Sequence, residues 1–211
     1  MAPTDMVDDA PLTIDGWSPR NYDGKYAGSV TLKDALVRSL NTVAVRITER
    51  VGRGRVVDVA RRLGVNSPLR ADASLALGAS EATLLETTQA YTALANGGQG
   101  VWAHGIAEIT GPGGTVLYRR SGTGLGRVVE PEHLRPLVEM MSAVITAGTG
   151  RAARVPWPSA GKTGTSQEWR DAWFVAFNRE ITAGVWIGND DGAHLATDGG
   201  KALDGAEQRL D

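Results

Sequence analysis

The sequence predicts an α/β protein of the α+β kind, in which helices flank an antiparallel sheet. Helical periodicity covers much of residues 31–95 and returns at 131–148, and apolar runs near the C-terminal end predict strands at about 159–166, 171–178 and 181–188. Neighbouring strands joined by short links pair antiparallel, and helices then cover the sheet. A length of 211 residues suits one domain.

Residues 1–30 are predicted to form an extended lead-in. The segment 8–29 is dense in Pro, Gly, Asn and Asp, which favour turns over periodic structure. The folded domain is expected to span 31–192 and to open with a helix for which Thr31 is available as the N-cap. One stripe of that helix carries Leu32, Ala35, Leu36 and Ser39.

Three more helical patterns follow this first one. The second carries Val43, Ile47 and Val51 and stops at Gly52, the third ends at Gly64, and the fourth covers about 81–95. Together they predict a helical bundle or layer.

A β-hairpin is predicted around Gly111-Pro112-Gly113-Gly114, because apolar and polar residues alternate on both sides of this turn. Such a hairpin is either an excursion or part of the main sheet. Glu130-Pro131 then opens a helix that ends near Gly148. Residues 193–211 are expected to form a divergent polar tail.

Composition excludes several classes of function. A net charge of -2 gives no electrostatic case for nucleic acid as a partner, and the absence of cysteine excludes thiolate catalysis. No metal or other cofactor is predicted, because the histidines lie far apart and lack ligands at metal-site spacing: His104, His133 and His194. No apolar run approaches the ~18 residues that span a bilayer, and the first residues do not resemble a secretory signal.

The run Lys162-Thr163-Gly164-Thr165 is predicted to lie on an exposed edge strand. Side chains alternate along a strand, so Thr163 and Thr165 share one face while Lys162 and Gly164 share the other. Gly164 leaves room for an extended, peptide-like ligand, and the hydroxyls with the ammonium group suit a terminal carboxylate. The alternative is a solvated strand end with a turn glycine.

Ser39-Leu40-Asn41 is the second candidate element. Ser39 ends one helical stripe and Asn41 stands just before the next helix, so the triplet occupies a bend in which both side chains can point the same way. The alternative makes Asn41 an ordinary N-cap and Ser39 a polar helix end.

A Ser-x-Asn element followed by a Lys-Thr-Gly strand is typical of penicillin-binding proteins and class A β-lactamases. Longer stretches agree as well, namely GWSPRNYDGKYAGSVTLKDALVRSLNTVAVRI, LGASEATLLETTQAYTALANGG, AGKTGTSQEWRDAWFVAF and VWIGNDDG. From about residue 7 to 192 the chain resembles the later part of the transpeptidase domain of class A, bifunctional penicillin-binding proteins of the 1A/1C kind. The resemblance implies the fold shared by these transpeptidases and the serine β-lactamases.

The resemblance also implies roles for the matching residues. Ser39 and Lys162 would be catalytic, with Ser39 relaying protons and Lys162 supplying positive charge. Asn41 would hold the amide of a peptidoglycan stem peptide or of a β-lactam antibiotic.

The strand residues would bind the other end of the same ligand. Thr163, Gly164 and Thr165 would be substrate-binding, with the threonines holding the terminal carboxylate and the Thr165 N–H forming half of an oxyanion hole. The implied reaction is acyl transfer from D-Ala-D-Ala stem peptides through a serine nucleophile, in the periplasm or cell envelope.

The sequence departs from this family in one respect that bears on catalysis. The nucleophilic Ser-x-x-Lys motif should precede all the stretches quoted above, and the single formal match is Ser159 to Lys162. On a strand an odd separation puts these side chains on opposite faces, about 10 Å apart along the chain. We therefore expect an N-terminally incomplete transpeptidase domain that is inactive alone.

Two other functions stay open on the sequence. One is a non-catalytic module that binds peptidoglycan peptides or β-lactams without being acylated. A serine β-lactamase is less favoured, because the lead-in and the helix-strand stretches resemble the synthases. The family is membrane-anchored, whereas this sequence carries neither an anchor pattern nor the glycosyltransferase domain.

Overall fold

A computed structural model describes residues 1–122, 124–166, 169–195, 197–198 and 201–202. Its α-helices are α1 (Leu32–Val37), α2 (Asn41–Val51), α3 (Arg53–Arg62), α4 (Leu84–Ala95) and α5 (Pro131–Ala147). Its strands are β1 (Met6–Asp9), β2 (Gly28–Thr31), β3 (Gln99–Gly100), β4 (Glu108–Thr110), β5 (Val116–Arg119), β6 (Gly126–Arg127), β7 (Ala160–Thr165), β8 (Asp171–Phe177), β9 (Thr182–Gly188), β10 (Thr197–Asp198) and β11 (Lys201–Ala202). Short 3-10 helices are η1 (Ala73–Leu77), η2 (Pro112–Gly114) and η3 (Arg151–Ala153).

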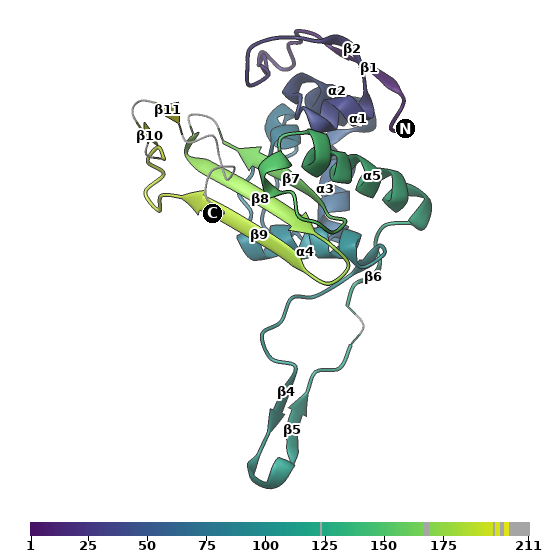
Figure 1. Cartoon of the computed structure of the whole chain (residues 1–211), viewed down its shortest axis with the longest axis vertical. Helices are drawn as coiled ribbons and strands as arrows, with labels where there is room; N and C mark the ends of the chain where they lie inside the picture. The colour runs from purple at the N-terminus through teal and green to yellow at the C-terminus, as the bar shows by residue number, and fades with distance from the viewer. Residues whose placement is uncertain (123, 167–168, 196, 199–200, 203–211) are drawn as a thin grey trace.

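The three strands predicted near the C-terminal end form one antiparallel sheet in the order β7-β8-β9. Helices α4 and α5 lie against this sheet (Figure 1). The contact with α4 is close, because a Cβ atom on Gly184 would come within 2.0 Å of the Thr88 hydroxyl oxygen. The core between the sheet and these helices holds Leu94, Met141, Ala160 and Phe177. The predicted α+β arrangement is therefore confirmed.

The lead-in contains regular structure that the sequence did not indicate. β1 and β2 pair antiparallel, with Met6 opposite Thr31 and Asp9 opposite Gly28. This pair lies beside α1 and α2 (Figure 1). A second core cluster of buried Ala35, Leu40 and Val43 packs there against Val7, Val30 and Ile47. The composition gave no signal for these strands, because each is only four residues long and the connection between them is long and rich in turn-forming residues.

The first helix begins where the sequence predicts and ends slightly earlier. Thr31 caps it by accepting a hydrogen bond from the Asp34 N–H, and the helix stops at Val37. The Ser39 N–H then donates to the Leu36 carbonyl (3.1 Å) and the Leu40 N–H to the Ala35 carbonyl (2.9 Å). This pattern closes a helix with a left-handed residue, normally glycine, and Ser39 holds that place with φ 55°.

The fourth helix begins later than the periodicity indicates. It starts at Leu84 rather than near Glu81, because Thr83 and Glu86 form a capping box that closes its first turn. The second and third helices, α2 and α3, end near Gly52 and Gly64 as predicted, and Gly52 is the C-cap of α2. The Thr-x-x-Glu signal for the start of α4 is present in the sequence.

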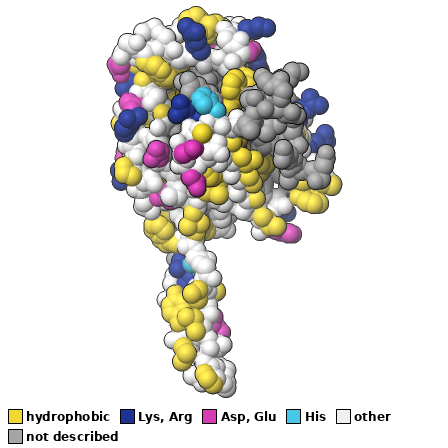
Figure 2. Space-filling view, turned by 90° about the vertical axis from the view of Figure 1, so that its left-hand side faces the viewer, with side chains coloured by type: hydrophobic (Ala, Val, Ile, Leu, Met, Phe, Trp, Pro, Cys, Tyr) yellow, Lys and Arg dark blue, Asp and Glu magenta, His cyan; other side chains and the backbone are white. Residues whose placement is uncertain are grey.

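The predicted hairpin is an excursion. β4 and β5 form an arm that stands away from the rest of the molecule (Figure 1), and every residue of both strands is exposed. Apolar side chains run along the arm (Figure 2), among them Ile109, Leu117 and Tyr118. In the predicted tail, β10 pairs with β11, and residues 203–211 lie outside the described part.

Candidate active site

Lys162 and Ser39 meet at the end of α1. The Lys162 Nζ atom donates to the Ser39 Oγ atom at 2.8 Å and to the Thr163 carbonyl at 2.8 Å. Ser39 reaches this position because its left-handed backbone turns the chain sharply between α1 and α2. The structure therefore brings together Ser39 and Lys162, the two residues for which the family resemblance implies catalytic roles.

The surroundings of Lys162 change its acid strength. Burial disfavours the charged ammonium group and lowers the pKa of Lys162 from 10.5 to about 8. At pH 7 roughly a tenth of the Lys162 side chains are therefore neutral, because the pKa of about 8 lies one unit above that pH. Together with the Ser39 contact, this makes Lys162 and Ser39 a pair that is able to pass a proton.

The outer edge of β7 offers backbone groups for a ligand. The Ser166 N–H donates to the Asp171 carbonyl at 3.0 Å, and hydrogen-bonding directions alternate along an antiparallel pair. Thr163 and Thr165 therefore turn their backbone groups away from β8, to the edge that has no strand partner in the described part of the chain. This is the edge-strand arrangement that the sequence predicts.

Gly164 keeps the face of this strand open. A Cβ atom built on Gly164 would meet a single neighbouring atom within 4 Å, the Trp173 Cβ at 3.3 Å. By contrast, a Cβ on Gly161 would come within 2.7 Å of the Val175 carbonyl. Glycine at 161 is thus required by packing against the backbone of β8, whereas a side chain at 164 would meet a single neighbouring atom of the protein.

Sequence reasoning missed one residue of this group, Thr149. Its hydroxyl lies 2.6 Å from the Thr163 hydroxyl, and its N–H donates to the Val37 carbonyl at 3.4 Å. Gly148 allows this approach, because a Cβ there would come within 2.4 Å of the same carbonyl. Thr149 thus links the end of α1 to the strand. Its only sequence signal is a threonine between two glycines after a helix.

Asn41 is the first residue of α2, and Leu40 takes the N-cap position without a side-chain bond. The predicted alternative, in which Asn41 is an ordinary N-cap, is therefore wrong. The Asn41 Nδ2 atom donates to the Arg20 carbonyl at 2.8 Å. The lead-in thus holds the side-chain amide at the bend that also carries Ser39.

The formal Ser159 to Lys162 match does not form a helical turn. Ser159 directly precedes β7 and Lys162 lies inside that strand. The Lys162 ammonium group contacts Ser39. We therefore assign no nucleophilic role to Ser159.

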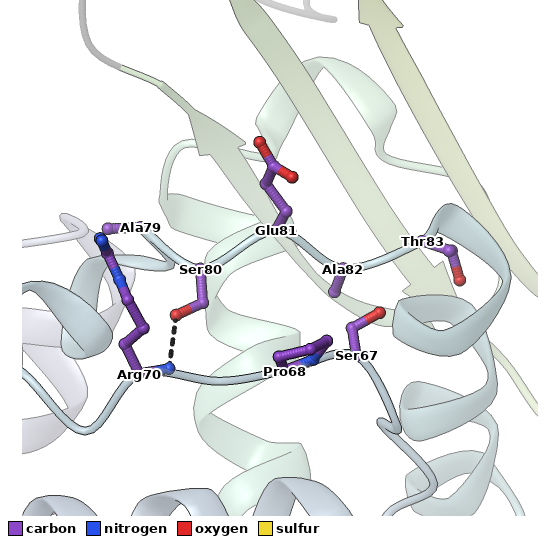
Figure 3. A pocket seen from close by; sticks show the side chains of 8 residues that line it. All are labelled: Ser67, Pro68, Arg70, Ala79, Ser80, Glu81, Ala82 and Thr83. Carbon is purple, nitrogen blue, oxygen red and sulfur yellow. Dashed lines mark hydrogen bonds between the residues drawn. The ribbon is translucent and has the colours of Figure 1, made fainter.

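A separate hollow of about 670 Å³ is lined by the segment that joins α3 to α4 in the sequence (Figure 3). It is lined by Ser67, Pro68, Arg70, Ala79, Ser80, Glu81, Ala82 and Thr83, and it includes none of the predicted site residues. Within the described residues, no group of His, Cys, Asp or Glu is arranged to hold a metal ion, and no helix has the length and apolar character needed to cross a membrane.

Comparison with known proteins gives one consistent family. Residues 1–202 match the penicillin binding protein transpeptidase domain. Penicillin-binding protein 1A of Neisseria cinerea is 37% identical over 204 residues, which cover 90% of this chain and 26% of that protein. Penicillin-binding protein 1A of Rickettsia conorii is 32% identical over 217 residues, which cover 89% of this chain and 28% of that protein. The chain thus spans about a quarter of the length of these curated relatives.

Solved structures show the same fold. Penicillin-binding protein 1A from Haemophilus influenzae superposes with a TM-score of 0.85 at 22% identity, covering 97% of this chain and 37% of that one. The PonA1 protein from Mycobacterium tuberculosis in complex with penicillin V gives 0.84 at 25% identity, covering 96% and 59%. The fold and the family expected from the sequence are both confirmed. This chain belongs to the penicillin-binding protein transpeptidase domain family.

Proposed function

We propose that this chain supplies the ligand-binding and proton-relaying part of a peptidoglycan DD-transpeptidase site. The observation that carries the proposal is the 2.8 Å contact between Lys162 Nζ and Ser39 Oγ, at the open edge of β7. Stem peptides that end in D-Ala-D-Ala, and β-lactams, are the ligands. Such a role places the protein in the periplasm or cell envelope.

The ligand binds along β7 as an added strand. Its terminal carboxylate meets the hydroxyl groups of Thr163 and Thr165 beside the Lys162 ammonium group, because charge-assisted hydrogen bonds to carboxylates are strong. Gly164 lets the peptide approach the strand, and Asn41 binds an amide further along the ligand. The Thr165 N–H, directed to the open edge, contributes to an oxyanion hole.

Lys162 and Ser39 handle protons in this reaction. A serine nucleophile passes its proton to the lysine of its Ser-x-x-Lys motif and attacks the ligand carbonyl, which breaks the D-Ala-D-Ala bond and leaves an acyl-enzyme. The leaving amine then needs a proton. The Ser39 hydroxyl donates that proton and is reprotonated by Lys162, whose lowered pKa favours the transfer. An amine of a second stem peptide then takes the acyl group and completes the cross-link.

The nucleophilic serine comes from outside residues 1–211. The single Ser-x-x-Lys match in the sequence is Ser159 to Lys162. Ser159 directly precedes β7 and Lys162 lies inside it. A serine and a lysine one helical turn apart are what this chemistry needs. We therefore expect acyl transfer to require a further segment.

Labelling with a fluorescent penicillin, followed by a denaturing gel, tests this assignment. The 211-residue chain should show no covalent band. A band would mean that a serine of this chain is activated, and the variants Ser39→Ala and Ser159→Ala would identify which.

A non-catalytic binding module is the second candidate, because the open edge of β7 and the Thr163 hydroxyl can bind a ligand without any acyl transfer. The DNA upstream of the first codon separates the two functions. An in-frame Ser-x-x-Lys region there supports the transpeptidase, and a stop codon without such a region supports the binding module.

A further inference from the structure

We propose that Asp9, Asn21 and Thr42 form a buried positioning network that holds the Asn41 side chain in its ligand-binding orientation. This inference rests on the proposed function, because it deepens the role of Asn41 in that site. It assigns a task to the lead-in, which neither its turn-rich composition nor the site motifs indicate. The network joins β1, the segment that follows it, and the first turn of α2.

Asp9 is the centre of the network. It is the last residue of β1 and is 0% exposed. Its carboxylate accepts hydrogen bonds from the Asn21 amide at 2.8 Å, from the Ala27 N–H at 2.7 Å, and from the Thr42 hydroxyl. A carboxylate that is removed from water is tolerated only when donors surround it in this way.

The charge state of Asp9 follows from these contacts. Burial acts to raise the pKa of this carboxyl, but hydrogen bonds from Thr42, Asn21 and the Ala27 N–H outweigh burial and hold the pKa below its usual value. Asp9 is thus ionised at neutral pH and acts only as an acceptor. All of its partners must present donors, which fixes their orientation.

Asn21 carries this orientation to α2. Its Nδ2 atom donates to Asp9 and also to the Lys25 carbonyl at 2.8 Å. Its Oδ1 atom therefore points the other way, and it accepts from the Thr42 N–H at 3.3 Å. The N-cap residue Leu40 offers no side-chain bond, so Asn21 satisfies an N–H group that α2 cannot satisfy itself.

The residues that precede Asn21 and Thr42 form the contact that orients the Asn41 side chain. Arg20 precedes Asn21 and Asn41 precedes Thr42, so the Asn21 to Thr42 bond brings the Arg20 carbonyl opposite the Asn41 amide, at 2.8 Å. A carbonyl accepts only from the NH2 end of an amide, which fixes the direction of the Asn41 side chain. Its Oδ1 atom and one N–H stay available to a ligand amide.

The network also continues toward the strand side of the site. Tyr22 follows Asn21, and its hydroxyl accepts a hydrogen bond from the Trp169 indole N–H at 3.2 Å. Trp169 lies in the link between β7 and β8, four positions after Thr165. Residues 20–22 therefore contact both the Asn41 bend and the link that follows the carboxylate-binding strand.

The variant Asp9→Asn tests the proposal, with Asp8→Asn as its matched control. Asp9→Asn sets an NH2 group against the donors of Asn21 or Ala27. Asp8 is exposed, so Asp8→Asn makes the same chemical change at the neighbouring position and leaves the network intact. Thr42→Val removes the hydroxyl at nearly constant volume, and Thr42→Ser restores it. Each variant is studied well below its unfolding temperature, with its melting curve recorded.

The first readout does not involve a ligand. In NMR spectra of the 211-residue chain, the two Asn41 side-chain N–H signals should be well separated and protected from exchange. Asp9→Asn and Thr42→Val should move them toward the values of a free amide, while Asp8→Asn and Thr42→Ser should leave them in place. Unchanged Asn41 signals in folded Asp9→Asn or Thr42→Val overturn the proposal.

The second readout is the affinity for benzylpenicillin. The effect of Asp9→Asn is measured in the wild-type chain and again in a chain that carries Asn41→Ala. Asp9→Asn should weaken binding about tenfold in the wild-type background and have little further effect when Asn41 is already alanine. Equal losses in both backgrounds mean that Asp9 acts through general stability and overturn the positioning role. If the wild-type chain binds no penicillin, the proposed function fails, and the Asn41 signals still decide the network.

Discussion

The Lys162 ammonium nitrogen lies 2.8 Å from the Ser39 hydroxyl oxygen, although 123 positions separate the two residues in the sequence. Two local features make this contact. Ser39 turns the chain with a left-handed backbone, and α5 leads the chain back past the end of α1 into β7. The contact between Lys162 and Ser39 thus depends on the bend at Ser39 and on the packing of the end of α5 against the end of α1.

The lowered pKa of Lys162 predicts a specific pH dependence of stability. The folded pKa of about 8 lies below the ordinary 10.5, so between these values the unfolded chain binds more protons and stability rises with pH. Unfolding free energies of the wild type and of Lys162→Met, measured by urea denaturation from pH 7 to 11, check this. The wild-type value minus the variant value should increase across that window. A constant or falling difference would show that the pKa is not lowered.

Ser39 occupies a backbone conformation that favours glycine, with φ 55°. Ser39→Gly and Ser39→Ala both remove the hydroxyl that contacts Lys162, but only glycine relieves the backbone. Ser39→Gly should therefore be more stable than Ser39→Ala by about 1 kcal/mol, measured by urea denaturation.

The matched control for this comparison lies inside α5. Ser142→Ala should exceed Ser142→Gly in stability, also by about 1 kcal/mol, because glycine weakens a helix interior. The same order at both positions would contradict the left-handed conformation of Ser39.

Thr149→Val tests the hydroxyl pair formed by Thr149, which follows α5, and Thr163 in β7. The variant keeps the side-chain volume but removes the 2.6 Å contact with Thr163, so Thr163 loses a partner that orients its hydroxyl. Affinity for benzylpenicillin should fall about fivefold, the value of one neutral hydrogen bond. Thr149→Ser should retain affinity.

Thr146→Val is the control for Thr149, because the Thr146 hydroxyl bonds only within its own helix, to the Ser142 carbonyl. It should leave affinity unchanged. If Thr149→Val and Thr146→Val behave alike, Thr149 has no role in binding.

Gly164→Ala and Gly161→Ala separate ligand space from packing. At position 164 a Cβ would meet only the Trp173 Cβ, at 3.3 Å, so the unfolding free energy should fall less than in Gly161→Ala, while affinity falls because the added methyl group keeps the ligand from the strand. At position 161 a Cβ would lie 2.7 Å from the Val175 carbonyl, so unfolding free energy should fall by about 1 to 3 kcal/mol. Retained affinity in Gly164→Ala would exclude binding along β7.

Local signals in the sequence were sufficient for the elements that build the site. Thr31 followed by an apolar stripe predicted α1, and short links between apolar runs predicted the antiparallel sheet, because capping and side-chain periodicity act over a few residues. The Ser39 bend and the Lys162 strand were likewise located from spacing.

Contacts between distant segments lay beyond sequence reasoning. The bond between Thr149 and Thr163 depends on how closely Gly148 approaches α1, and burial of Asp9 depends on pairing between two short strands. Neither has a periodic signature. An aspartate in a turn-rich segment is normally solvated, so only the fold shows that Asp9 is enclosed by donors.

A titration of the 211-residue chain with benzylpenicillin, followed by backbone and side-chain NMR, tests the central claim most directly. The largest shifts should fall on the Ser39 to Asn41 bend and on Lys162 to Thr165, and they should vanish in the Thr163→Val, Thr165→Val double variant. Shifts concentrated elsewhere, or unchanged in that variant, would contradict a carboxylate-binding strand that faces the Ser39 bend.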